Sequence, residues 1–228
     1  TNILEDCDLS IFDTDSQRST VSGLPANEDS PIALIANPAL VNTALALEQS
    51  VGRHIRYGAS TKDWLDKGRR GNFGHGDKEE WLRMARSDPA YSSLDCSGLI
   101  NVALFQAYGV DFDGCTYDYK HLTIDGQQLT SLIMSKQITP ALLQPGDFIV
   151  KLNSACGSTE ETNHMVMVVS VSGDMITTIE SHAGDNDGVE VRERSADWYN
   201  ENWPDLFVSR WVGPGAIEVT PGTQPQGS

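Results

Sequence analysis

The chain has 228 residues, of which 39% are hydrophobic, enough for one large domain with a substantial core. Its formal net charge is −16, from 16 Lys and Arg against 32 Asp and Glu. Such a chain would repel a phosphate backbone, which argues against nucleic acid as a partner. It holds no run of about 18 apolar residues, so we expect no membrane span.

We divide the chain into three parts by composition. Residues 1–30 are acidic and rich in Ser, Thr and Asp, which predicts an extended N-terminal arm. Residues 31–213 have the composition of one globular domain. Residues 214–228 are rich in Pro, Gly and Thr and predict a tail or linker. We expect the protein to be a monomer.

Helices are predicted in the first half of the domain. The first begins at the Asn-Pro pair of residues 37–38, a capping residue followed by proline at the first helical position, and runs to Gly52. Residues 79–86 predict a short helix. It lies in a segment, residues 59–93, that carries a basic cluster and two tryptophans. That segment is either a lid or wall of a binding cleft or an ordinary solvated excursion.

Another predicted helix begins at a cysteine. An apolar run follows Cys96 and ends at Gly109, which predicts a buried helix of about three turns. Asp95 is a good N-cap, and the sulfur of Cys96 would then lie at the positive end of the helix dipole, where a thiolate is favoured. Two interpretations stay open on this stretch alone: a nucleophilic thiol, or a small buried cysteine at the start of a helix.

The second half predicts an antiparallel sheet. Residues 110–140 are polar and mixed, and we assign no element to them. After a turn at residues 143–147 the pattern changes to strands. These are predicted at residues 148–152, 164–171, 175–182, 189–192 and 207–212. Helices followed by an antiparallel sheet make an α+β fold.

The hairpin at residues 172–174 decides where two histidines lie. If it is a three-residue loop, paired residue numbers sum to about 346, so His164 faces His182 on one side of the sheet. A two-residue loop would place them on opposite faces. Two adjacent imidazoles suit a base for the Cys96 thiol and a residue that orients it. A metal site made by the same three residues is possible, but no spacing favours it, so we predict no metal and no cofactor.

The cysteines show no zinc-binding pattern. None of Cys7, Cys96, Cys115 and Cys156 lies in a Cys-x-x-Cys pair, so a structural zinc site is not expected. We favour unpaired cysteines. The alternative is one disulfide, with Cys115 and Cys156 as the favoured pair.

The chain resembles the NlpC-type cysteine peptidases, papain-like enzymes that cut cell-wall peptides. Their nucleophile motif, Asp-Cys-Ser-Gly-Leu, is matched by residues 95–99. A preceding glycine motif is partly matched by residues 52–58, where His54 replaces the usual proline and Ile55 the usual tyrosine. The later matches, in order, are Leu143–Asp147, His164, His182-Ala183 with Gly188-Val189, and Phe207–Arg210.

The resemblance implies a papain-like NlpC-type fold for residues 31–213, with N-terminal helices packed on a central antiparallel sheet. It implies that Cys96 is the nucleophile, His164 the general base and His182 the third polar residue. Asp95 and Ser97 would help to hold the free amine of the substrate peptide.

Tyr57 is our candidate for the aromatic group that supports the oxyanion, because Ile55 stands at its usual place. The implied function is a secreted or cell-wall-associated endopeptidase that hydrolyses stem-peptide amides of bacterial peptidoglycan, for instance after γ-D-glutamate. Two alternatives stay open: another thiol acyl transfer (a transferase, deamidase or toxin-type amidase), or a binding module that has lost activity.

Overall fold

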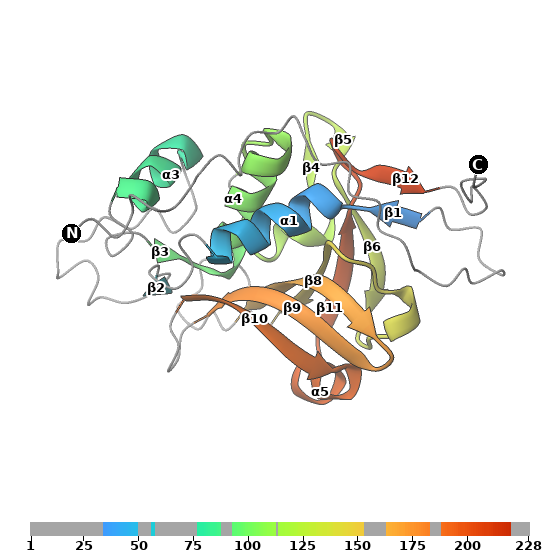
Figure 1. The fold of residues 1–228 in the computed structure, drawn as a ribbon. Helices are drawn as coiled ribbons and strands as arrows, with labels where there is room; N and C mark the ends of the chain where they lie inside the picture. The colour runs from blue at the N-terminus through green and yellow to red at the C-terminus, as the bar shows by residue number, and fades with distance from the viewer. Residues whose placement is uncertain are drawn as a thin grey trace, which may run out of the picture. The chain divides into compact units, whose positions relative to one another are not determined.

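A six-stranded antiparallel sheet is the centre of the computed structural model (Figure 1). Its order is β10-β9-β8-β7-β11-β6. The strands are β6 (Thr130–Ser135), β7 (Asp147–Lys151), β8 (His164–Ser172), β9 (Met175–His182), β10 (Gly188–Ser195) and β11 (Leu206–Trp211). The structure describes residues 34–49, 56–57, 77–87, 93–112, 114–152, 163–182 and 188–219. Apart from Leu34, these belong to one unit, Ile35–Val219.

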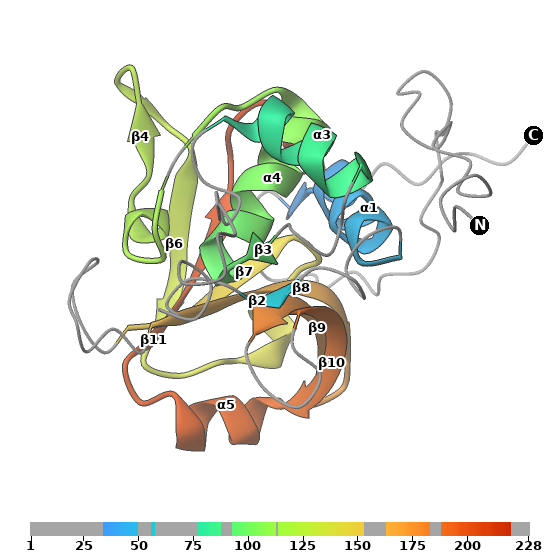
Figure 2. The same ribbon diagram turned by 90° about the vertical axis from the view of Figure 1, so that its left-hand side faces the viewer.

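Helices cover both faces of this sheet. They are α1 (Pro38–Leu47), α3 (Lys78–Ser87), α4 (Cys96–Tyr108) and α5 (Ala196–Asn202). In Figures 1 and 2, α1 and α4 lie on one side of the sheet and α5 on the other. The helices and the antiparallel sheet confirm the α+β class.

Short elements complete the described part of the chain. Paired strands are β1 (Leu34–Ala36) with β12 (Ile217–Val219), β2 (Arg56–Tyr57) with β3 (Ser93–Leu94), and β4 (Thr123–Ile124) with β5 (Gln127–Gln128). Single-turn helices are η4 (Asp118–Lys120) and η5 (Pro140–Leu142). Strand β12 falls in the segment predicted as a tail, and β6 falls in the region left unassigned.

Side-chain alternation along the strands divides the core into two clusters. On the α4 face, Met165, Met167 and Ile179 pack with α1 and α4. On the α5 face, Val166 and Val168 pack with α5 and with Ile138 and Leu143, which flank η5. Because neighbouring residues of a strand point to opposite faces, these clusters fix the face of every residue of β8 and β9.

The predicted first helix forms, but its capping residue has another contact. Proline occupies the start of α1 as predicted, and Leu40 and Ala44 are fully buried. The side chain of Asn37 makes no cap; its Nδ2 donates instead to the carbonyl of Trp211, at 3.1 Å. Asn37 therefore joins the start of α1 to the end of β11.

The turn before β7 is held by a buried ion pair. The carboxylate of Asp147 accepts from Arg210 on β11, with Nε 2.7 Å from Oδ1 and Nη2 2.8 Å from Oδ2. Burial raises the pKa of Asp147, against the lowering effect of Arg210 and of the backbone N–H of Gln144. Gly146 has φ +91° and donates its N–H to Val168. The ion pair thus joins Leu143–Asp147 to Phe207–Arg210, two of the stretches on which the family resemblance rests.

The prediction of a three-residue hairpin loop is wrong. Ser172 pairs with Met175, so the loop has two residues and the pairing sum there is 347. A bulge between Val168 and Ser170 then leaves one residue of β8 unpaired. Beyond the bulge the paired residue numbers sum to 346, as predicted, and Met167 faces Ile179.

The expectation of unpaired cysteines is also wrong. Cys115 is disulfide-bonded, whereas Cys96 is not in a disulfide. Cys7 and Cys156 lie outside the described residues, so the pairing of Cys115 with Cys156 stays a prediction.

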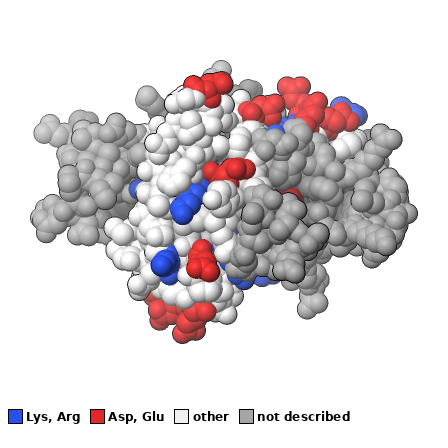
Figure 3. Space-filling view, turned by 180° about the vertical axis from the view of Figure 1, so that it is seen from behind, with Lys and Arg blue, Asp and Glu red and all other residues white. Residues whose placement is uncertain are grey.

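The surface shown in Figure 3 carries charge of both signs. Acidic and basic side chains lie next to one another there, separated by uncharged surface. In the described ranges, no helix has both the length and the apolar character that a membrane crossing requires.

Candidate active site

The predicted nucleophile stands at the first position of α4. The N-cap Asp95 has extended backbone angles, and its Oδ1 accepts the Gly98 N–H at 2.6 Å and the Ser97 hydroxyl at 3.1 Å. Gly109 ends the helix in the left-handed conformation, with φ +67°. Cys96 is 5% exposed. Its thiol therefore lies where the aligned peptide dipoles of a 13-residue helix favour a thiolate.

The segment before Cys96 is tied to the end of β9. The hydroxyl of Ser181, fully buried, donates to the carbonyl of Leu94 at 3.0 Å. Leu94 is also the backbone partner of Tyr57 in the parallel pair β2–β3. The backbone of Tyr57 thus lies beside the strand that leads into Cys96; its side chain is outside the described atoms, so its role at the oxyanion stays a prediction.

A buried polar pair that joins η4 to α4 escaped the sequence analysis. The hydroxyl of Tyr119 donates to Oδ1 of Asn101 at 2.6 Å, and Asn101 Nδ2 donates to the carbonyl of Gly114 at 3.0 Å. Both side chains are fully buried. Asn101 follows Ser97 by one helical turn, so it extends the polar side of α4 inward.

Tyr119 feels the charge of the residues at the start of α4. Burial, and after it the negative charges of Asp95, Asp118 and Cys96, raise the pKa of Tyr119 well above its usual value. The phenol therefore stays protonated and keeps donating to Asn101. No motif marked Tyr119 in the sequence, because its residue range had no predicted element.

The two predicted histidines lie on the α5 face of the sheet. His164 is on the same side of β8 as Val166 and Val168, and its ring meets Trp203 edge to face at 5.8 Å. By the same alternation His182 lies on the α5 face of β9. The prediction that the two share one face agrees with the observed register of β8 and β9.

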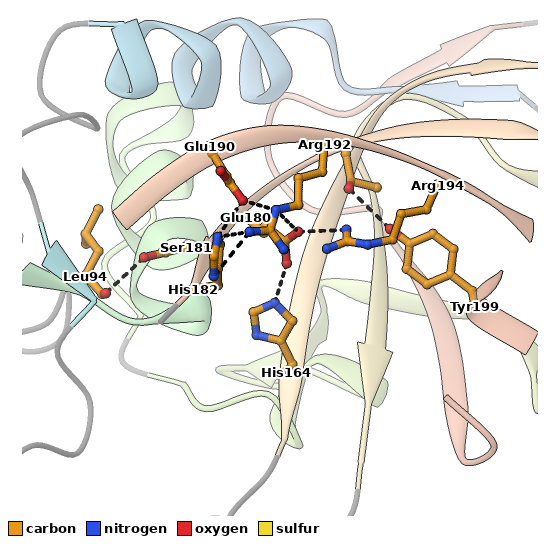
Figure 4. Close-up of polar contacts among 10 residues, drawn as sticks. Leu94, His164, Glu180, Ser181, His182, Glu190, Arg192, Arg194 and Tyr199 are labelled. Atoms are coloured by element: carbon orange, nitrogen blue, oxygen red, sulfur yellow. Dashed lines mark hydrogen bonds and ion pairs between the residues drawn. The ribbon is translucent and has the colours of Figure 1, made fainter. Parts of the chain in front are cut away.

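The direct partner of His164 is a glutamate. Its Nε2 lies 2.5 Å from Oε2 of Glu180, a residue that is 2% exposed (Figure 4). Oε1 of Glu180 forms ion pairs with Arg194, at 2.7 Å, and with Arg192, at 3.5 Å. Burial acts to raise the pKa of Glu180, but the hydrogen bond and charge of His164, together with Arg194, lower it to about 2. Glu180 is thus a carboxylate at any ordinary pH.

His182 has its own carboxylate. Its Nε2 contacts Glu190 on β10, and Arg192 contacts both Glu190 and the His182 ring. Glu190 is the direct cross-strand partner of Glu180. Two His–Glu pairs therefore stand side by side, with arginines between and beside the two like charges (Figure 4).

The structure places the predicted site residues in two groups. Asp95, Cys96 and Ser97 form one group at the start of α4, in the core cluster of the α4 face or beside it. His164 and His182 form a second group on the α5 face. Both groups lie towards the same end of the sheet, since Ser181, next to His182, holds Leu94.

The described residues offer no metal centre. Among them, His, Cys, Asp and Glu side chains make no group of three that could hold a metal ion. The chemistry available in this part of the chain is a thiol at a helix terminus and two imidazole–carboxylate pairs.

Comparison with known proteins gives only distant structural likenesses. No family model matches the chain, and a search of curated proteins finds no match. One solved structure that matches is a Staphylococcus aureus protein described as similar to a lipoprotein of the NLP/P60 family. The two are 16% identical with a TM-score of 0.40, and the match covers 81% of this chain but only 45% of that one. A likeness of this strength decides neither family nor activity.

Proposed function

We propose that this protein is a cysteine peptidase or amidase that hydrolyses peptide amide bonds of bacterial peptidoglycan through a thioester at Cys96. One observation carries the proposal: a cysteine that is not in a disulfide occupies the first position of a capped helix, in the sequence Asp-Cys-Ser-Gly-Leu. The order of motifs along residues 37–212 supports the papain-like NlpC-type fold and an extracytoplasmic location.

The chemistry is acyl transfer in two steps. The Cys96 thiolate attacks the amide carbonyl, and the backbone N–H of Cys96 with a second donor stabilises the oxyanion. The imidazolium of His164 protonates the leaving amine as the C–N bond breaks. Water, deprotonated by the same imidazole, then hydrolyses the thioester and releases the acid.

The residues around Cys96 suit the recognition of a peptide amine. Asp95 accepts two hydrogen bonds at Oδ1, and Ser97 adds a hydroxyl. A carboxylate and a hydroxyl beside the thiol form an acceptor pair for the ammonium group of a short peptide. We therefore propose substrates with a free amine close to the cleaved bond.

The test is digestion of purified peptidoglycan by the wild type and by Cys96→Ser. Muropeptides are separated and identified by mass spectrometry, and thermal melting checks that both proteins are folded. We expect new stem-peptide fragments with the wild type alone. Identical profiles from the two folded proteins would refute the peptidase proposal. Fragments that carry a new acyl acceptor instead of water would indicate a transferase.

One observation favours a second candidate, a binding module without activity. His164 lies on the α5 face of β8, whereas Cys96 belongs to the core cluster of the α4 face. The binding module is the alternative in which the thiol and this imidazole do not meet during a reaction. Co-sedimentation with insoluble peptidoglycan distinguishes the two: binding by the wild type and by Cys96→Ser, with no fragments from either, supports the binding module.

A further inference from the structure

The two His–Glu pairs of β8, β9 and β10 differ from what the family resemblance implies. The resemblance makes His182 the partner that orients His164. In the structure, Nε2 of His164 lies 2.5 Å from Glu180, and Nε2 of His182 contacts Glu190. Each imidazole is thus engaged by a carboxylate, and each carboxylate comes from a different strand.

We propose that Glu180, rather than His182, is the residue that positions His164 for proton transfer. This inference rests on the proposed function, because it gives His164 the role of base for Cys96. Glu180 touches neither thiol nor substrate in this scheme and acts through the ring of His164.

The contact between His164 and Glu180 determines which ring nitrogen can act as the base. An ionised carboxylate only accepts hydrogen bonds, so Nε2 of His164 must carry the hydrogen. In the neutral ring the lone pair then lies on Nδ1, which is the nitrogen left to take a proton from a thiol. The charges of the protonated His164 ring and of Arg194 lower the pKa of Glu180 to about 2, and Arg194 still faces the carboxylate when the ring is neutral.

The surroundings hold both members of the pair in place. Glu180 is 2% exposed, and Arg194 lies 2.7 Å from its second oxygen. The ring of Trp203 meets the His164 ring edge to face at 5.8 Å. The ring is therefore held from one side by a carboxylate and from another by an aromatic edge, which limits its rotation.

Other charged groups face this pair from the neighbouring strands. Lys151 of β7 is the direct cross-strand partner of His164. Glu190 and Arg192 of β10 lie opposite or diagonal to Glu180, and His182 follows two residues later on β9. Tyr199 of α5 lies near Arg194. Of these groups, Glu190 is the matched control, since it makes the equivalent contact with the other imidazole.

The first test needs no variant. Nitrogen-15 NMR of histidine-labelled wild-type protein reads the tautomer of each neutral ring, and His164→Gln identifies the His164 signals by their loss. We expect His164 as the Nε2–H tautomer. A ring in the Nδ1–H tautomer would overturn the proposal even if no Glu180 variant folds.

The second test compares Glu180→Gln with Glu190→Gln on a peptide cut by the wild type. We expect kcat to fall by about 10²-fold or more in Glu180→Gln, with KM within about threefold, because proton transfer and not binding is impaired. Glu190→Gln should stay within about threefold in both. The Nε2–H signal of His164 should weaken in the first variant only.

The outcomes separate the two proposals. If Cys96→Ser cuts as well as the wild type, the proposed function fails, whatever the Glu180 variant does. If Cys96→Ser is inactive while Glu180→Gln and Glu190→Gln have equal kcat, the function stands and the role of Glu180 is refuted. A loss of kcat in His182→Gln without a loss in Glu180→Gln returns the positioning role to His182.

Discussion

The buried carboxylate of Glu180 makes the stability of the fold depend on acid. Its pKa is about 2 in the folded protein, against an ordinary value of 4.5. Burial alone would raise the pKa; the hydrogen bond to His164 and the charges of His164 and Arg194 outweigh it. A group with a lowered pKa contributes stability that is present above its unfolded pKa and is lost as the pH falls through the folded one.

The magnitude follows from the shift. At about 1.4 kcal/mol per pKa unit, Glu180 contributes about 3 kcal/mol above pH 5, and about 2 kcal/mol of this is lost by pH 3. Glu180→Gln removes the titrating group, so its free energy of unfolding should change less between pH 5 and pH 3, by about 2 kcal/mol. Below pH 5 an ordinary imidazole is already charged, so histidines add little to this difference.

Urea unfolding followed by circular dichroism at pH 5, 4 and 3 measures the effect. Glu190→Gln is the control, because Glu190 is more exposed and has a different set of partners. Parallel curves for the wild type and Glu180→Gln would refute the linkage. They would show that Arg194 and His164 do not hold the carboxylate ionised in the folded protein.

Three further substitutions test other contacts. Asp95→Ala removes the cap of α4 and should cost about 1 kcal/mol in urea unfolding; a midpoint equal to that of the wild type would contradict this. Gly146→Ala should cost about 1–3 kcal/mol, since φ is +91° and the new Cβ would lie 2.7 Å from that of Asn37; a thermal melt unchanged from wild type would contradict this. Arg210→Leu leaves the buried carboxyl group of Asp147 without its partner and should lower the free energy of unfolding in urea by about 3–5 kcal/mol. A loss under about 1 kcal/mol would mean that the Asp147–Arg210 pair is not buried in solution.

The helix at Cys96 was predictable because its signals are local. Asp95 as N-cap, an apolar run and Gly109 at the end lie within a single stretch of sequence, and each acts on its own neighbours. Helix α3 was predictable from its local sequence in the same way. Asn37 shows the limit of such signals: it stands at a cap position, yet its amide donates to a residue 174 positions away. Only the folded chain decides which of two possible contacts an amide makes.

Beyond the bulge, the register of β8 and β9 was predicted correctly from an incorrect loop, whereas between the loop and the bulge the predicted pairing is off by one residue. The loop has two residues, which on its own would reverse the face of every residue of β8 relative to β9. The bulge at Val169 reverses the face a second time. Hairpin rules predict the type of turn from the residues of the loop. A bulge depends instead on the twist of the sheet and on packing against both clusters, and neither can be predicted from a local sequence pattern.

The choice of face matters more for function than the pairing. Whether His164 faces His182 is a question of register between two strands, and the alternating pattern answers it. Whether His164 lies on the side of Cys96 depends on which apolar residues of β8 pack under α4. Met165 and Met167 do so here, and both sets of alternate residues in this strand are apolar, so the sequence favours neither face. A buried strand with apolar residues on both sides carries no signal of which side it presents. The α5 helix, which the sequence did not predict, supplies the second apolar layer that lets His164 lie beside Trp203.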